Sequence, residues 1–255
     1  MSKEFLQTIL KQKEQEVAVM SHEELQSLRS TYSLYEYLKS HLQELQLIAE
    51  VKKASPSLGD INLAVDIVEQ ARTYERCGAA MISVLTDEIF FKGHLDYLRK
   101  ISSQVTIPTL NKDFIIDEKQ IVRARNAGAT VILLIVAALP EKRLQELYDF
   151  ATGLGLEVLV ETHNLAELEI AHRIGAQIIG ANNRNLVTFE TDIHTSLQLS
   201  AHFKDDRVYV SESAIFSKED AELVAPYFHA ILVGTALMQA EDVAEKIKEL
   251  KIDKG

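Results

Sequence analysis

The sequence contains no tryptophan, one cysteine, four prolines and ten glycines among its 255 residues. A single cysteine, Cys77, excludes an internal disulfide, so we expect a reducing compartment and a buried structural role for this thiol. No apolar run approaches the roughly 20 residues of a membrane-spanning helix. The first 20 residues also lack the apolar core and small-residue cleavage site of a secretory signal. These absences predict a cytoplasmic protein that does not bind membranes.

Positive charge is also in short supply, with 27 lysines and arginines against 38 aspartates and glutamates. The resulting net charge of −11 argues against a nucleic-acid groove, although a small anionic ligand needs only a local positive pocket. The histidines, acidic residues and cysteine show no spacing typical of a metal site, so we expect no bound metal. The remaining composition, 47% hydrophobic and 25% charged, is that of an ordinary globular protein with an ample core.

What the sequence does contain is a series of eight short apolar runs, each followed by a segment with helical periodicity. Runs rich in Val, Ile and Leu without clean alternation are typical of parallel strands that are buried on both faces. Three helical segments end in Gly-Ala, where glycine supplies a left-handed cap and the next strand begins at once. We predict strands over residues 45–50, 81–85, 107–111, 130–135, 157–160, 178–181, 207–211 and 229–233. We predict helices over residues 62–77, 93–103, 117–127, 140–154, 164–174, 192–201, 217–225 and 241–250.

Eight alternating units predict one α/β domain, a single (β/α)8 TIM barrel over residues 45–255. The alternative is an open doubly wound sheet, which is disfavoured because no GxGxxG turn follows the first strand. Residues 1–44 carry no strand signal, and apolar residues at helical spacing predict an N-terminal helical extension packed against the barrel. Within it, SHEEL at 21–25 resembles a capping box and predicts that a helix begins there.

Polar residues follow several predicted strands, at the end where a (β/α)8 barrel builds its active site. Glu50 and Lys52 close the first strand, and their spacing of two places both side chains on one face. The next residues form a turn that contains Ser55, whose hydroxyl is a donor for an oxyanion. Taken alone, this segment is almost as well explained by a surface salt bridge and an ordinary turn.

Two further strand ends carry single ionisable groups. Lys112 closes the third predicted strand and is a candidate proton donor, because desolvation pulls a lysine pKa towards neutrality. Glu161 ends the fifth after an unbroken apolar run, and we expect desolvation to raise its pKa, opposed by whichever lysine lies near. A carboxylate in such a place is costly unless it is paired or takes part in the chemistry.

The sixth and seventh predicted strands end in Asn182 with Arg184 and in Glu212 with Ser213. An amide beside a guanidinium can orient a hydroxyl and a carboxylate at once. Each strand end is ambiguous by itself. Five strand ends that present acid, base or amide groups together favour a catalytic site.

The last two strands are followed by residues suited to a phosphate group. Ala214 lies in the loop after the seventh, and Gly234 and Thr235 follow the eighth. Glycine permits close approach of the backbone, and a short helix that begins at Thr235 can bind an anion at its N-terminus. Barrels usually bind phosphate after these two strands.

Histidine is the remaining group with catalytic potential. Most of the eight histidines are scattered, and we expect them at the surface. His163, two residues past Glu161, is the one that lies close to a candidate residue. A structural or surface position is nevertheless the simpler interpretation.

Eight motifs in order closely resemble the indole-3-glycerol phosphate synthase family, namely IAEVKKASPS, VLTDEIFFKGHLDYL, LNKDFIIDEKQI, ILLIVAAL, GLEVLVETHN, IIGANNRNL, VSESAI and LVGTALM. The match runs from about Leu47 to Asp242. It implies a carbon–carbon lyase that acts without a cofactor in tryptophan biosynthesis. The implied substrate is 1-(2-carboxyphenylamino)-1-deoxyribulose 5-phosphate, which loses CO2 and water to give indole-3-glycerol phosphate.

The same resemblance implies roles for the candidate residues. Lys112 matches the general acid at the ribulose carbonyl oxygen, and Glu161 the acid or base of the dehydration. Lys52 matches the residue that holds the anthranilate carboxylate, with Glu50 as its partner. Implied positions for the rest of the substrate are Asn182, Arg184, Glu212 and Ser213. Implied phosphate positions are Ser55, Ala214, Gly234 and Thr235, where Ala214 replaces the usual glycine of the family.

Three other functions deserve comparison. Phosphoribosylanthranilate isomerase would need a cysteine at a strand end, whereas Cys77 lies before the second predicted strand. A Schiff-base aldolase would use Lys112 as a nucleophile. A non-catalytic barrel would have no use for so many polar groups in costly buried positions. We therefore expect a phosphorylated small molecule as the partner, and a monomer because the helical extension covers surface otherwise free for pairing.

Overall fold

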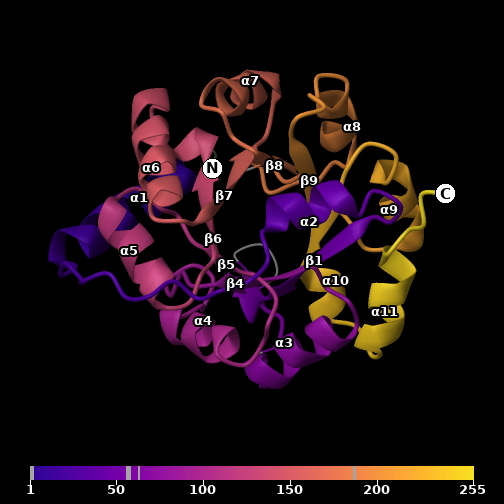
Figure 1. Ribbon diagram of the computed structural model, residues 1–255, viewed down its shortest axis with the longest axis horizontal. Coiled ribbons are helices and arrows are strands. Elements are labelled where there is room, and N and C mark those ends of the chain that lie inside the picture. Colours follow the sequence, from indigo (N-terminus) through magenta and orange to yellow (C-terminus); the bar gives the residue numbers. More distant parts are fainter. Residues whose placement is uncertain (1–2, 56–58, 63, 186–187) are drawn as a thin grey trace.

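The chain forms a closed barrel with a small hairpin at one loop. The computed structural model describes residues 3–55, 59–62, 64–185 and 188–255. Within these ranges, eight parallel strands close in the order β1-β10-β9-β8-β7-β6-β5-β4. Figure 1 shows the helices arranged in a ring around them. The barrel strands are β1 Gln46–Val51, β4 Met81–Leu85, β5 Thr109–Lys112, β6 Val131–Ile135, β7 Glu157–Thr162, β8 Ile178–Asn182, β9 Val208–Glu212 and β10 Ala230–Val233. The hairpin consists of β2 Ala54–Ser55 and β3 Gly59–Asp60.

The predicted fold class is confirmed, and every predicted strand is present within two residues of its expected bounds. The first barrel helix begins five residues later than predicted because Asp66 caps it, accepting hydrogen bonds from the backbone N–H groups of Val68 and Glu69. Across the described parts of the chain, no helix combines the length and apolar character needed to cross a membrane. The helices are α1 Lys3–Val19, α2 Leu34–Ser40, α3 Ile67–Arg76, α4 Leu95–Ser102, α5 Glu118–Asn126, α6 Glu141–Gly153, α7 Leu165–Arg173, α8 His194–Ser200, α9 Lys218–Val224, α10 Thr235–Met238 and α11 Val243–Leu250, with a 3-10 turn η1 Val136–Ala138.

The period of two along each strand divides the core into an outer and an inner cluster. The outer cluster packs strand residues such as Leu47 and Ile82 against the helices. The inner cluster joins Ile48, Leu110 and Val210 with the corresponding residues of the other strands. The interior of the barrel is therefore filled with apolar side chains below its mouth, as in other barrels of this type.

The N-terminal extension contacts both ends of the barrel. On α1, Lys13 forms ion pairs with Asp87 and Asp113, which follow β4 and β5 at the C-terminal mouth. At the opposite end, α2 inserts Leu34 and Leu38 into the inner apolar cluster. The helix is fixed there because its first backbone N–H groups donate to the carboxylate of Glu157, the first residue of β7.

The helix predicted to begin at residues 21–25 is wrong, since residues 20–33 are irregular. This segment joins α1 at one end of the barrel to α2 at the other. An extended chain advances about 3.3 Å per residue and a helix about 1.5 Å, so an extended path spans the barrel with fewer residues. The side chain of Asn126 on α5 binds it at Glu23, Glu24 and Gln26.

Candidate active site

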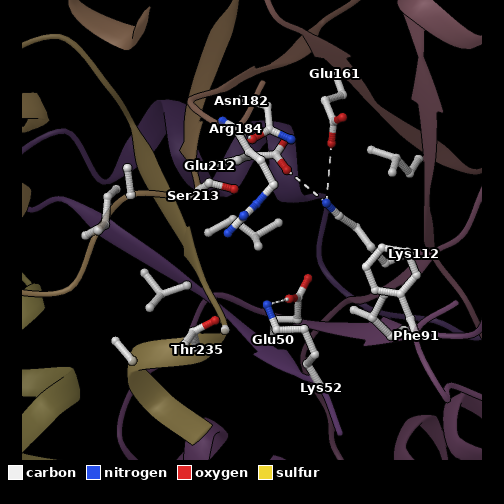
Figure 2. A pocket seen from close by; sticks show the side chains of 18 of the residues that line it. Glu50, Lys52, Phe91, Lys112, Glu161, Asn182, Arg184, Glu212, Ser213 and Thr235 are labelled. Atoms are coloured by element: carbon white, nitrogen blue, oxygen red, sulfur yellow. Dashed lines mark hydrogen bonds and ion pairs between the residues drawn. The ribbon is translucent and has the colours of Figure 1, made fainter. Parts of the chain in front are cut away.

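The last inward positions of five strands are polar and form a ring at the mouth of the barrel, above the inner apolar cluster. Figure 2 shows these side chains converging on one pocket from different strands. Of the twelve residues predicted for the site, all except Ser55 line this pocket. The structure gives no side-chain environment for Ser55, which lies in β2. The eleven are Glu50, Lys52, Lys112, Glu161, Asn182, Arg184, Glu212, Ser213, Ala214, Gly234 and Thr235.

Lys112 lies between two buried carboxylates at the centre of this ring. Its Nζ is 3.0 Å from Glu212 Oε2 and 3.4 Å from Glu161 Oε2, as the dashed lines of Figure 2 mark. Burial alone would lower the pKa of Lys112, but the charges of Glu212, Glu161 and Glu50 outweigh it and raise the pKa well above its usual value. The expected shift towards neutrality is therefore wrong. The carboxylates favour the protonated form of Lys112 in the free site.

The two carboxylates beside Lys112 differ in ionisation. Burial raises the pKa of Glu161, but Lys112 and His163 outweigh that effect and hold it well below its usual range. The expected rise for Glu161 is therefore also wrong. At Glu212, burial and the charge of Glu161 outweigh the attraction of Lys112 and raise the pKa to about 7. In this cluster the surroundings favour an ionised Glu161 and a protonated Lys112, and they raise the pKa of Glu212 towards neutrality.

Glycine makes room for two of the carboxylates. A Cβ atom at Gly180 on β8 would collide with Glu212 Oε1, so a side chain at this position would displace the Glu212 carboxylate. A Cβ at Gly234 would lie 2.5 Å from Glu50 Oε1 and 3.1 Å from Lys52 Nζ. Gly234 therefore accommodates the ion pair of Glu50 and Lys52, whose Oε1 and Nζ atoms are 3.1 Å apart. The sequence had suggested close approach to a ligand as the reason for this glycine.

The walls of the pocket are formed by apolar residues that were not among the predicted site residues. Two aromatic rings, Phe91 and Phe114, line it together with Leu133, Ile135 and Leu232. The two aromatic ring centroids lie 6.0 Å apart. Phe114 lies two residues after the end of β5, so its position at a strand end was an available signal, whereas Phe91 lies six residues after the end of β4.

The loop after β9 has an unusual backbone. Ser213 and Ala214 both have positive φ, 65° and 60°, a region that non-glycine residues rarely occupy. The side chain of Asn183 holds the loop by donating to the carbonyl of Ser213 and to Ser211 Oγ, each at 3.1 Å. Thr235 begins the short helix α10, as expected. The strain at Ala214 explains why glycine would suit this position.

Arg184 reaches the pocket from the loop after β8. Its backbone N–H donates to Asn182 Oδ1 at 3.0 Å, and its guanidinium donates to the carbonyl of Phe189 at 3.0 Å. Burial lowers its pKa from the usual value. The chain therefore fixes the orientation of this cation beside Asn182.

Two residues outside the predicted site are placed clearly by the structure. His163 is half-buried, with 11% of its side chain exposed, and lies 3.2 Å from Glu161 Oε1, so the surface interpretation is wrong. Cys77 is half-buried after α3, at the N-terminal side of β4 and away from the mouth. Among the described residues, no group of three His, Cys, Asp or Glu side chains is placed to hold a metal ion.

Sequence comparison agrees with this geometry. A family model described as indole-3-glycerol phosphate synthase matches residues 6–250. The chain belongs to the indole-3-glycerol phosphate synthase family. It is 94% identical to the synthase of Streptococcus sanguinis (strain SK36), 93% to that of Streptococcus gordonii and 74% to that of Streptococcus mutans, and each alignment covers 100% of both chains. Family members of this name are carboxy-lyases.

Solved structures of other enzymes share the fold. A 3-hexulose-6-phosphate synthase superposes with a TM-score of 0.63 at 15% identity, covering 81% of this chain and 98% of that one. A thiamine phosphate pyrophosphorylase from Pyrococcus furiosus gives a TM-score of 0.59 at 20% identity, covering 81% and 93%. At such low identity these similarities establish the barrel and nothing about the reaction.

Proposed function

We propose that this chain catalyses the ring closure of 1-(2-carboxyphenylamino)-1-deoxyribulose 5-phosphate to indole-3-glycerol phosphate, a step of tryptophan biosynthesis. The observation that supports this most is the ring of acids and lysines above an apolar pocket, in a member of this family. The apolar walls suit the aromatic ring of the substrate. The charged mouth suits its carboxylate, carbonyl and phosphate groups.

In the first step, the aromatic carbon that bears the carboxylate attacks the ribulose carbonyl carbon. The carbonyl oxygen takes a proton from Lys112, which is protonated at any physiological pH because carboxylates surround it. Lys52 holds the substrate carboxylate, and Glu50 fixes Lys52 through their 3.1 Å ion pair. CO2 then leaves, and its bonding electrons restore the aromatic ring.

In the second step, the new hydroxyl group leaves as water and the adjacent CH2 loses a proton, which forms the indole double bond. Glu161 accepts that proton, since its lowered pKa keeps it ionised and able to act as a base. Glu212 lies 3.0 Å from Lys112 and returns a proton to it after the first step, so that Lys112 also donates the second proton, to the hydroxyl group that leaves as water. The ribulose oxygen gains two protons and the CH2 gives up one, so one proton is taken up from solvent overall.

The other residues position the substrate. Asn182, Arg184 and Ser213 line the pocket beside the reacting carbons and orient hydroxyl groups. The loops after β9 and β10 bind the phosphate through backbone groups at Ala214 and Gly234 and the hydroxyl of Thr235, with Ser55 as a further donor. The enzyme acts in the cytoplasm as a monomer, without a cofactor, a metal or a nucleic-acid partner.

The alternative functions fit the geometry less well. A Schiff-base lysine must be neutral to attack a carbonyl, whereas two carboxylates hold Lys112 as an ammonium group. An isomerase with a catalytic cysteine would need that thiol at the mouth, and Cys77 lies at the other side of the barrel.

A direct assay tests this proposal. The purified protein is mixed with the carboxyphenylamino deoxyribulose phosphate substrate, and indole fluorescence is followed over time. We expect fluorescence to rise with release of one CO2 per product molecule, and with no added metal or cofactor. Substrate consumed without indole formation, or no consumption at all, would rule the activity out.

A further inference from the structure

His163 is enclosed between two carboxylates. It follows β7 directly, and 11% of its side chain is exposed. Its Nε2 lies 3.2 Å from Glu161 Oε1, and its Nδ1 lies 3.0 Å from Glu167 Oε2. An ionised carboxylate can only accept hydrogen bonds, so a ring with hydrogen on both nitrogens suits both neighbours. Nδ1 is hydrogen-bonded to Glu167, whereas Nε2 is at ion-pair distance from Glu161 and makes no hydrogen bond with a described residue. Two carboxylates at these distances favour the doubly protonated, positively charged ring.

Glu167 is itself fixed, which makes it an anchor for the ring. Its Oε2 accepts a hydrogen bond from the backbone N–H of His163 at 2.8 Å, and its Oε1 accepts one from Asn164 Nδ2 at 2.7 Å. Asn164 in turn caps α7, accepting from the backbone N–H of Glu167. The carboxylate is thus tied to the first turn of α7, and its hold on Nδ1 sets the direction in which Nε2 points.

We propose that His163 is a positioning residue for the reaction proposed above, an imidazolium that is anchored by Glu167 and holds the Glu161 carboxylate ionised and oriented into the pocket. Glu161 then has a cation on each oxygen, with His163 at Oε1 and Lys112 at Oε2. This inference rests on the proposed function, in which Glu161 is the base of the dehydration step. A histidine that touches no substrate thereby determines the strength and direction of that base.

The charges around His163 support this state. Burial disfavours the charged ring, but Glu161 and Glu167 outweigh it and raise the pKa of His163 to about 10. The cavity beside the ring is also lined by Arg184, Glu190 and Asp192 from the loop after β8, and by apolar and amide residues of α1. On the far side of Glu161 lie Lys112 and Glu212.

The raised pKa of His163 makes the stability of the fold depend on pH. A histidine pKa that is higher in the folded protein means that folding favours the imidazolium. The stabilisation by His163 is therefore fully present below its ordinary pKa of 6.5 and is lost as the pH rises through about 10.

The test uses two variants of the whole enzyme and a matched control. His163→Gln keeps a hydrogen-bond donor but removes the positive charge, and Glu167→Gln removes the anchor while leaving the ring. The control is His194→Gln, because His194 also pairs with a carboxylate, Asp192 at 2.8 Å, but is 68% exposed. For each, kcat and KM are measured from acid to alkaline pH, together with the melting temperature.

We expect His163→Gln to move the acid limb of kcat to higher pH by about one unit or more, because removal of a neighbouring cation raises a carboxyl pKa. KM should stay within a few-fold, and kcat should recover above the displaced limb. Glu167→Gln should shift the limb in the same direction by less, and His194→Gln should leave it in place. An unmoved limb in His163→Gln, with an active wild type, would overturn the inference while leaving the proposed function intact.

The protonation of His163 can also be measured in the wild-type enzyme without substrate, even if His163→Gln fails to fold. In NMR spectra of the wild type, the side-chain nitrogen resonances of His163 report its protonation. They are assigned by their loss in a histidine variant or by their shift in Glu167→Gln. We expect the imidazolium signature to persist past pH 8. Titration near 6.5 would overturn the inference whatever the activity. A wild type that makes no indole-3-glycerol phosphate would overturn the proposed function, and the inference with it.

Discussion

Two lysines of this molecule, Lys13 and Lys112, each lie between two carboxylates that have different surroundings. Lys13 on α1 lies 2.8 Å from Asp87 and 2.9 Å from Asp113, with 3% of its side chain exposed. It also pairs at 3.0 Å with Glu16 on its own helix, which is partly exposed. Lys112 on β5 also lies between two carboxylates, at 3.0 and 3.4 Å, with 14% exposed. In both cases the carboxylates outweigh burial and raise the lysine pKa.

The difference lies in what else the carboxylates bind. Asp87 accepts from the backbone N–H groups of Phe90 and Phe91, and Asp113 accepts from the backbone of Phe114 and the hydroxyl of Thr86. The structure shows no backbone donors of this kind for Glu161 and Glu212 among the described residues.

The two clusters also differ at one carboxylate oxygen each. Asp87 Oδ2 and Glu212 Oε1 are both buried and accept no hydrogen bond from any residue that the structure describes. Asp87 Oδ2 is paired with Lys13 at 2.8 Å, whereas the ion pair of Glu212 uses its other oxygen, Oε2. Buried polar atoms are normally satisfied, so an unsatisfied one beside a pocket is a sign of function. An ion pair with carboxylates therefore does not by itself identify a catalytic lysine. The two clusters differ in whether backbone N–H groups also donate hydrogen bonds to the carboxylates.

The largest expected effect is on Lys112. Lys112→Ala should lower kcat by about 10²–10⁴-fold, the usual cost of removing a general acid, while the barrel stays folded. Steady-state kinetics and circular dichroism measure both. Lys142→Ala, at an exposed position of α6, is the control. A Lys112→Ala enzyme that keeps more than about a tenth of wild-type kcat would contradict the assignment.

The opposite pattern is expected at Lys13. Lys13→Met leaves Asp87, Asp113 and the partly exposed Glu16 without their cation. Breaking a buried ion pair in this way costs about 3–5 kcal/mol of unfolding free energy. Denaturant unfolding should show that loss. Activity well below the new melting temperature should fall far less than in Lys112→Ala. Lys11→Met, exposed on the same helix, should be neutral. If Lys13→Met is as stable as the wild type, the ion pairs of Lys13 do not stabilise the fold.

The phosphate loops can be tested without mutation. Inorganic phosphate should compete with substrate, so it should raise the apparent KM several-fold at high concentration and leave kcat unchanged. The dephosphorylated substrate should bind much more weakly for the same reason. If KM does not respond to tens of millimolar phosphate, the anion does not bind after β9 and β10.

The smallest expected effect concerns backbone strain at Ala214. Its φ of 60° costs an alanine about 1–2 kcal/mol, partly offset by the entropy that glycine loses on folding. Ala214→Gly should therefore stabilise the protein by up to about 1 kcal/mol, with kcat little changed. The matched control is Ala201→Gly, at φ −63°, which should destabilise. A lower melting temperature for Ala214→Gly would show that the loop is not strained.

Much of the fold could be predicted because its signals are local. Apolar runs and Gly-Ala caps placed each barrel strand within two residues. The irregular segment 20–33 could not be predicted, because its path is set by the distance between the two barrel ends rather than by its own residues. The capping pattern at 21–25 is a local signal that this long-range constraint overrode.

The residues of the site were predictable, whereas their ionisation was not. Strand ends are readable from the sequence, and eleven of the twelve candidates line one pocket. The pKa of each group depends on which carboxylates lie beside Lys112. These carboxylates come from strands that are far apart in the sequence, so their proximity is known only from the fold. For this reason Lys112 and Glu161 shift in the directions opposite to those expected, and the raised pKa falls to Glu212 instead.

The central claim is that the Lys112 cluster is acid–base machinery and that Glu161 is its base. The most direct measurement is kcat, KM and melting temperature for Glu161→Gln, which keeps size and hydrogen bonding but cannot take a proton. We expect kcat to fall by about 10²-fold or more, with KM within a few-fold of the wild type, the pattern of an interaction made in the transition state. A near-normal kcat with a lowered melting temperature would show instead that Glu161 only holds the barrel mouth together.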